Sequence, residues 1–288
     1  MNKLIFSASV LLAGALAACS PLSVVNAVSP GGAAQATSAL RYGSDPRNML
    51  DVYRPAAGAH DAPVIVFFYG GNWVSGKRED YAFVGRALAA RGFVVVIPDY
   101  RLYPQVRYPD FLVDGAAAVV WTVREVAAHG GDPKQVFLMG HSAGAYNAAM
   151  LALDPRWLEG QGMTRSMLRG WIGLAGPYDF LPVQNPTTRP VFNAPATPPD
   201  SQPLSHVSAL APPALLIAAS KDKLVDPTRN TGGMAAALRA AKVPVRELYY
   251  DSISHTTLVA SLSNSLQRLA PTLDAVEAFV RSDGGRKE

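Results

Sequence analysis

The sequence alternates short, fully apolar runs with longer amphipathic runs, and this alternation constrains the fold more than any other feature. The apolar runs are typical of strands buried on both faces of a parallel sheet: residues 63–68, 93–97, 136–139 and 214–219. Residues 168–175 and 245–250 are predicted as two further strands, although they contain charged residues. Between them lie runs with helical periodicity: residues 79–91, 110–128, 145–153, 229–241 and 262–281. Strands that alternate with helices indicate βαβ units. Right-handed crossovers then predict an α/β fold with a doubly wound, mostly parallel sheet flanked by helices.

Length and composition favour one large domain at residues 41–284. The chain has 288 residues, of which 49% are hydrophobic and 17% charged, which excludes a disordered body. Residues 50–53 alternate and predict an early edge strand. Residues 176–206 are rich in proline and predict an irregular excursion over the end of the sheet. The net charge is only +4, without a dense Lys/Arg cluster, so no nucleic-acid partner is expected.

The N-terminus has the pattern of an export signal. A charged start is followed by an apolar run from Leu4 to Ala18 and then by Cys19, which is the only cysteine. Residues 16–19 (Leu-Ala-Ala-Cys) resemble a bacterial lipobox. We therefore expect a signal peptide at residues 1–18, a lipidated Cys19 as a membrane anchor, and a flexible spacer at residues 19–40. By the same resemblance, Ser20 favours the periplasmic side of the outer membrane. The alternative is a plain secretory signal and a secreted or periplasmic protein.

A G-x-S-x-G pentapeptide, residues 140–144, lies between an apolar strand and a helical run. Small residues on both sides allow a sharp turn that exposes the Ser142 hydroxyl, the geometry of a nucleophile elbow. The turn also places Ser142 at a helix N-terminus, which favours negative charge. Ser142 is therefore the candidate nucleophile.

A serine hydroxyl needs a base, and the base needs an orienting group. In folds with this elbow the chain order is Ser, then Asp or Glu, then His. His255 follows the last predicted strand and is the candidate base. Asp222 follows the strand at 214–219 and is the favoured orienting carboxylate; Asp226 and Asp251 are alternatives. Asp226 precedes Pro227 and also suits the start of a helix.

An acyl-transfer site also needs N–H donors for an oxyanion. The main-chain N–H of Ala143, next to the nucleophile, is one expected donor. The others are expected from Gly70, Gly71 and Asn72, which follow the first buried strand. No residue is assigned to a metal.

Taken together, the motifs resemble those of the α/β-hydrolases, in the group of hormone-sensitive-lipase and kynurenine-formamidase-like (BD-FAE-like) esterases. The matching segments are residues 50–55, 69–73, 98–102, 130–133 and 140–144, with the loops of Asp222 and His255. The resemblance implies ester hydrolysis without a cofactor, and amide or formamide hydrolysis in some members. The group usually has His-Gly-Gly-x-Trp where this chain has Tyr69, so its substrate preference is an open question.

We therefore expect a carboxylesterase (EC 3.1.1) that acts on small-molecule esters of short or medium acyl chains. The short connection between residues 153 and 168 leaves little or no room for a lid. The alternatives are an arylformamidase or amidase with the same triad, a noncatalytic binding protein on the same fold, and a serine peptidase. The sequence does not predict the oligomeric state.

Overall fold

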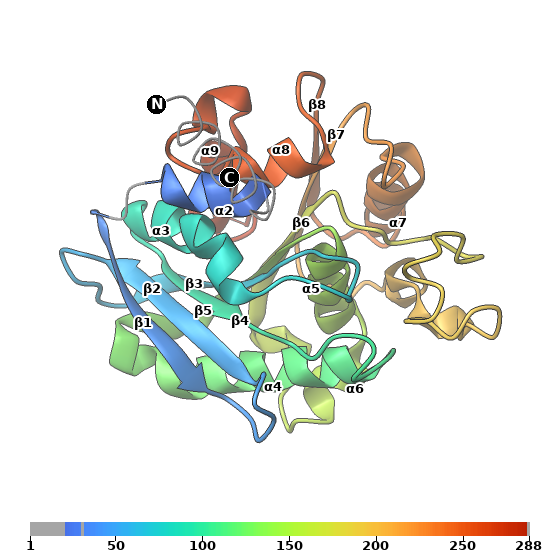
Figure 1. The fold of residues 1–288 in the computed structure, drawn as a ribbon, viewed down its shortest axis with the longest axis horizontal. Coiled ribbons are helices and arrows are strands. Elements are labelled where there is room, and N and C mark those ends of the chain that lie inside the picture. Colours follow the sequence, from blue (N-terminus) through green and yellow to red (C-terminus); the bar gives the residue numbers. More distant parts are fainter. Residues whose placement is uncertain (1–20, 30–31, 287–288) are drawn as a thin grey trace, which may run out of the picture.

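The computed structural model describes residues 21–29 and 32–286, and their centre is a sheet of eight strands (Figure 1). The strands are β1 (Ala34–Arg41), β2 (Met49–Pro55), β3 (Ala62–Phe68), β4 (Val94–Pro98), β5 (Gly131–His141), β6 (Leu168–Leu174), β7 (Ala214–Ala219) and β8 (Val245–Tyr250). Their order is β1-β2-β4-β3-β5-β6-β7-β8. β1 and β2 pair antiparallel with their neighbours, and all other pairs are parallel. The predicted mostly parallel sheet is confirmed.

Helices cover both faces of the sheet (Figure 1). They are α2 (Pro21–Ala27), α3 (Ala82–Ala90), α4 (Asp110–Glu125), α5 (Ala143–Leu153), α6 (Pro155–Glu159), α7 (Gly233–Ala240), α8 (His255–Ala260) and α9 (Thr272–Arg281). α3 contacts α9, and α4 contacts α5. Because parallel strands end at the same edge, the loops after β3, β5, β7 and β8 meet there, and this edge positions the candidate site.

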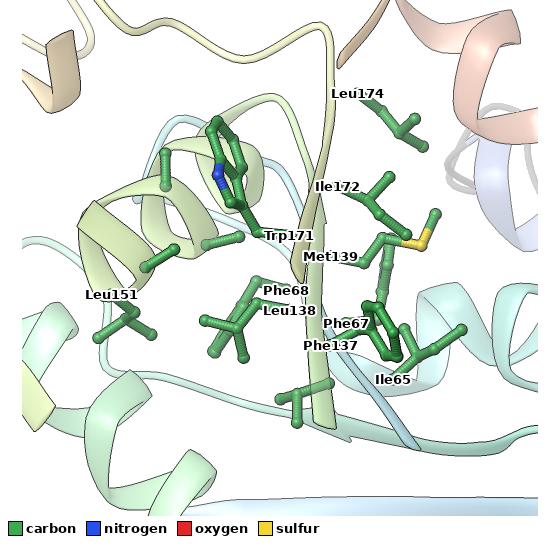
Figure 2. Packing of buried hydrophobic residues seen from close by; sticks show 14 of the residues in the cluster. Ile65, Phe67, Phe68, Phe137, Leu138, Met139, Leu151, Trp171, Ile172 and Leu174 are labelled. Carbon is green, nitrogen blue, oxygen red and sulfur yellow. The ribbon is translucent and has the colours of Figure 1, made fainter. Parts of the chain in front are cut away.

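The core is built from the two sides of the central strands. Successive side chains of a strand point to opposite faces. Figure 2 shows Leu138 and Trp171 on the side that α5 covers, and Met139 and Ile172 on the other side. All four side chains are fully buried. This two-sided burial explains why the runs at 63–68, 136–139 and 214–219 are apolar at every position rather than at alternate ones.

The expected spacer is wrong in its second half. β1 pairs with β2 at residues 34–37 and 40–41, with a shift of register between them, so residues 34–41 belong to the sheet, and β2 is not the edge strand. Ahead of it, α2 is fixed to the domain by Asn26, whose side chain accepts from Phe83 N (2.8 Å) and donates to the carbonyl of Glu79 (2.6 Å). β1 buries little side-chain surface. Main-chain pairing holds it in place, and such pairing leaves no hydrophobic pattern in the sequence.

The expected helix at residues 262–281 is also wrong in its first half. The chain forms the short helix α8 and then turns, and α9 starts only at Thr272. Pro271 lies directly before α9, where its missing N–H is tolerated, but it cannot continue a helix from the preceding residues. The predicted helix at 229–241 begins as a π-helical turn, Thr228–Gly232, before α7.

Candidate active site

Ser142 alone makes the turn between β5 and α5. Its backbone has φ 55° and ψ −122°, a conformation that residues other than glycine rarely adopt. The flanking glycines are required here. A Cβ on Gly140 would lie 2.1 Å from the carbonyl oxygen of Gly144, and one on Gly144 would lie 2.0 Å from the main chain at the end of β3. The sharp turn predicted from the pentapeptide is present, with the serine at the carboxyl edge of the sheet.

A cavity of about 340 Å³ opens beside Ser142. Four segments line it: residues 72–73, residues 142–143, parts of 177–188, and parts of 223–230. Residues 142–143 belong to the elbow, and residues 177–188 belong to the predicted excursion, which therefore forms one wall of the cavity. Trp73 and Phe180 bring aromatic rings to the lining. Its charged residues are of both signs: Lys223, Arg229, Asp179 and Asp226. The cavity can take up a small molecule that has both apolar and polar parts.

Asp222 and His255 are joined by a short hydrogen bond. His255 Nδ1 lies 2.6 Å from Asp222 Oδ2, and both side chains are buried. The second carboxylate oxygen, Oδ1, accepts from the main-chain N–H groups of Leu224 (2.8 Å) and Val225 (3.2 Å). Burial alone would raise the pKa of Asp222, but the hydrogen bond and charge of His255 and the two N–H donors outweigh it and lower that pKa. Asp222 is therefore a fixed anion that orients the imidazole and leaves Nε2 free.

The two alternative carboxylates have other positions. Asp226 Oδ1 accepts from the main-chain N–H groups of Thr228 (2.9 Å) and Arg229 (3.0 Å), and so caps the turn that leads into α7. Asp251 is exposed after β8. Neither is bonded to His255, so the geometry favours Asp222.

His141 holds His255 beside the elbow. His141 Nε2 lies 3.0 Å from the main-chain carbonyl oxygen of His255, and the two ring centroids are 4.9 Å apart. Burial, together with the charge of His255, lowers the pKa of His141 to about 3. The neutral ring therefore donates from Nε2 to that carbonyl. Among the hydrogen bonds of the described residues, none joins the Ser142 hydroxyl to His255; such contacts often tighten only when substrate is bound.

The loop after β3 brings unpaired N–H donors to the same place. A Cβ on Gly70 would lie 3.1 Å from Ser142 Cβ, so this main chain runs directly past the nucleophile. Gly71 has φ +127°, which favours glycine, and its carbonyl closes the turn by accepting from two N–H groups further along the loop. Within residues 32–286, the main-chain N–H groups of Gly71, Asn72 and Ala143 donate no hydrogen bond. They are available to a ligand.

Tyr69 occupies the position at which the esterase group that the sequence resembles usually has histidine. It is fully buried below this loop. Its hydroxyl donates to Asp99 Oδ1 (2.9 Å) and accepts from Arg47 Nη2 (2.9 Å). Arg47 also donates to the carbonyl oxygens of Gly76, at the end of the loop, and of Tyr100 (2.7 Å). Sequence reasoning gave no role to Arg47 or Asp99. Two signals pointed to Asp99: it follows a strand at the same edge, and it lies in the family-like segment 98–102.

Other sequence expectations fall outside this geometry. Cys19, the expected lipidation site, lies outside the described residues. In the ranges 21–29 and 32–286 no cluster of three or more His, Cys, Asp or Glu side chains is placed to hold a metal ion. Within the same ranges, no helix has both the length and the apolarity needed to span a membrane.

Comparison with known proteins relates the chain to esterases. The sequence model of the BD-FAE family matches residues 50–234. Esterase LipC of Mycobacterium tuberculosis is 32% identical over 69% of this chain and 54% of its own length. The probable isoprenylcysteine alpha-carbonyl methylesterase ICME of Oryza sativa subsp. japonica is 37% identical over 51% of this chain and 36% of its own length. The chain thus spans about a third to a half of these relatives.

Solved structures show the same fold. Esterase B from Lactobacillus Rhamnosis superposes with a TM-score of 0.74 at 20% identity, over 100% of this chain and 99% of that one. The strand order, the elbow after β5 and the loops at the carboxyl edge match an α/β-hydrolase fold. With the family match over residues 50–234, the chain belongs to the BD-FAE family of α/β-hydrolases.

Proposed function

We propose that the protein is a serine hydrolase of carboxylic esters and forms an acyl-enzyme on Ser142. The observation that carries the proposal is the grouping of three features around the elbow. These are Ser142 on a strained turn that opens to the cavity, the buried His255–Asp222 pair held against the neighbouring His141, and main-chain N–H groups that have no partner among the described residues. Together they supply a nucleophile, a base and an oxyanion site, which are the requirements for acyl transfer.

In the first step, Ser142 Oγ attacks the ester carbonyl carbon while His255 Nε2 takes the hydroxyl proton. Asp222 keeps the proton of the imidazole on Nδ1, so that Nε2 is the free base, and stabilises the imidazolium that forms. The carbonyl oxygen becomes an oxyanion and accepts from the N–H of Ala143 and from the N–H groups of the Gly70–Asn72 loop. His255 then returns the proton to the leaving alcohol.

In the second step, water attacks the acyl-enzyme with His255 again as the base, and the acid is released. The cavity of about 340 Å³ lies at the small end of ligand sites and favours short or medium acyl groups. The similarity to LipC, an esterase, and to ICME, a probable methylesterase, supports the same reaction class. No cofactor enters this scheme.

The test is hydrolysis of p-nitrophenyl esters from acetate to decanoate, beside an aryl formamide. We expect activity that is highest with the shorter esters and is lost in Ser142→Ala. Ser252→Ala is the matched control, because Ser252 is exposed in the loop before His255 and should leave activity unchanged. Turnover of the formamide alone would contradict ester specificity. Turnover of neither substrate by folded protein would favour a binding role.

We further propose, from the lipobox resemblance, that Cys19 carries lipid and anchors the protein in the bacterial envelope. Ser20 favours the outer membrane. The test compares the full chain with Cys19→Ser in a bacterial host fed radiolabelled palmitate. We expect labelled wild type in the membrane fraction and unlabelled variant in the periplasm; equal membrane association of both would contradict the anchor.

A further inference from the structure

The loop that carries the proposed oxyanion donors has a strained backbone. Asn72 and Trp73 both lie in the left-handed region, with φ of 54° and 59°. Residues other than glycine adopt this region only when surrounding contacts impose it. The contacts that hold Trp73 therefore also hold the N–H groups of the two residues before it.

The Trp73 ring is 2% exposed and packs among aromatic side chains. It stacks on Phe111 at 5.7 Å between centroids and meets Tyr146 and Phe192 edge-on at 5.1 and 4.8 Å. Such contacts fill space but tolerate sliding and rotation of the ring. A hydrogen bond is directional, and the indole of Trp73 makes one: Nε1 donates to Asn147 Oδ1 at 2.9 Å.

Asn147 belongs to α5, the helix that starts directly after Ser142. Its bond to Trp73 therefore ties the oxyanion loop to the element that carries the nucleophile. Asn147 is fully buried, and its Nδ2 has no hydrogen-bond partner among the described residues. An unpaired buried amide lowers stability, so an apolar residue of similar size would suit the interior of this helix better. A functional role of Asn147 would offset this loss of stability.

We propose that Asn147 is a positioning residue, which fixes the Gly70–Asn72 oxyanion loop relative to Ser142 through Trp73. The inference rests on the proposed ester hydrolysis. Asn147 acts through Trp73 and contacts no reacting atom. Without the bond, the loop is free to shift against α5, and small errors in the placement of oxyanion donors weaken transition-state binding far more than substrate binding.

The test compares Asn147→Leu, Trp73→Phe and the double variant in ester hydrolysis and thermal unfolding. We expect each single change to lower kcat roughly tenfold, and KM to stay within about twofold in Asn147→Leu, whose altered side chain does not line the cavity. Because both changes break the same bond, the double variant should lose no more activity than the worse single one. A trifluoromethyl ketone adds Ser142 Oγ to its carbonyl carbon, and the resulting hemiketal mimics the tetrahedral intermediate with its oxyanion, so its affinity should fall in parallel with kcat/KM.

Unfolding separates positioning from a merely structural role. Asn147→Leu leaves the indole N–H of Trp73 unpaired, and Trp73→Phe leaves the whole Asn147 amide unpaired, so both should lower Tm. The double variant removes both polar groups and should recover Tm relative to Trp73→Phe, which has the same smaller ring. Under the proposal, kcat does not recover with Tm. The matched control is Thr122→Val, which removes a fully buried hydroxyl that bonds only within α4 (2.8 Å to the carbonyl of Ala118) and should change Tm but not kcat.

Three results would overturn the proposal: an unchanged kcat in Asn147→Leu, multiplied losses in the double variant, or activity that recovers together with Tm. Failure of the proposed function is distinguishable, because it would appear as wild-type protein without ester hydrolysis. An active wild type with unaffected variants refutes only the role of Asn147.

Discussion

Replacement of Tyr69 by phenylalanine removes one buried hydroxyl beneath the oxyanion loop. That hydroxyl bonds to Asp99 and to Arg47, each at 2.9 Å. Hydrogen bonds to charged groups contribute about 1.5–3 kcal/mol each. Asp99 keeps its bonds from Arg78, and Arg47 keeps the carbonyl oxygen of Tyr100, so neither charge is left alone. We therefore expect Tyr69→Phe to lower the free energy of unfolding by about 2–3 kcal/mol, less than the full sum.

The assay is urea unfolding followed by tryptophan fluorescence, with a thermal melt in parallel. For a domain of this size the expected loss corresponds to a fall in Tm of roughly 4–12 °C. Tyr249→Phe is the matched control, because Tyr249 bonds to Glu247 at an exposed position and should change stability little. A Tyr69→Phe protein within about 0.5 kcal/mol of wild type would contradict this expectation, since the buried bonds would then contribute nothing net.

Three further outcomes are expected. Burial lowers the pKa of His141 from 6.5 to about 3. The contribution of His141 to the free energy of unfolding therefore has its full value above pH 6.5 and falls by up to ~1.4 kcal/mol per pH unit as the pH drops towards 3. Urea titrations should show a shallower fall in His141→Gln, and equal pH slopes in the two proteins would contradict this expectation. The Arg229–Asp179 ion pair (3.0 Å) is half-exposed, so Arg229→Gln should cost less than about 1 kcal/mol of stability. Ester kinetics of that variant should show a larger change in KM than in kcat, because the pair holds the cavity wall; a change in kcat alone would count against this. Gly140→Ala puts a methyl group 2.1 Å from the Gly144 carbonyl and should cost at least about 3 kcal/mol; a normal melting curve would exclude the required turn.

Much of the fold could be predicted from the sequence because its central strands are buried on both faces. The runs at 63–68 and 214–219 have no polar position, and such a run predicts a buried strand whatever segments surround it. β1 could not be predicted, because main-chain bonds to β2 hold it and its side chains are largely exposed. The start of α9 was misplaced because a helical pattern at 262–271 is overridden by Pro271 and the turns before it.

The proposed site also has a part that could be predicted from the sequence and a part that could not. Ser142, His255 and Asp222 were predictable because each comes shortly after a strand at the same edge of the sheet, and the choice against Asp226 followed from its suitability as a cap. The support of the oxyanion loop was not predictable. Arg47 lies in a polar loop near the start of the chain, and Asn147 lies inside a helix. Only the folded chain brings them to Tyr69 and Trp73.

The most direct test of the account is covalent labelling with a fluorophosphonate, which reacts with an activated serine in an oxyanion site. Intact-mass measurement should show one added probe on the wild-type protein, and peptide mapping should place it on Ser142. Ser142→Ala should stay unlabelled, and Asp222→Asn should react far more slowly because the imidazole loses its orienting anion. Labelling at another serine, or none on folded wild-type protein, would contradict the central claim that Ser142 is the nucleophile.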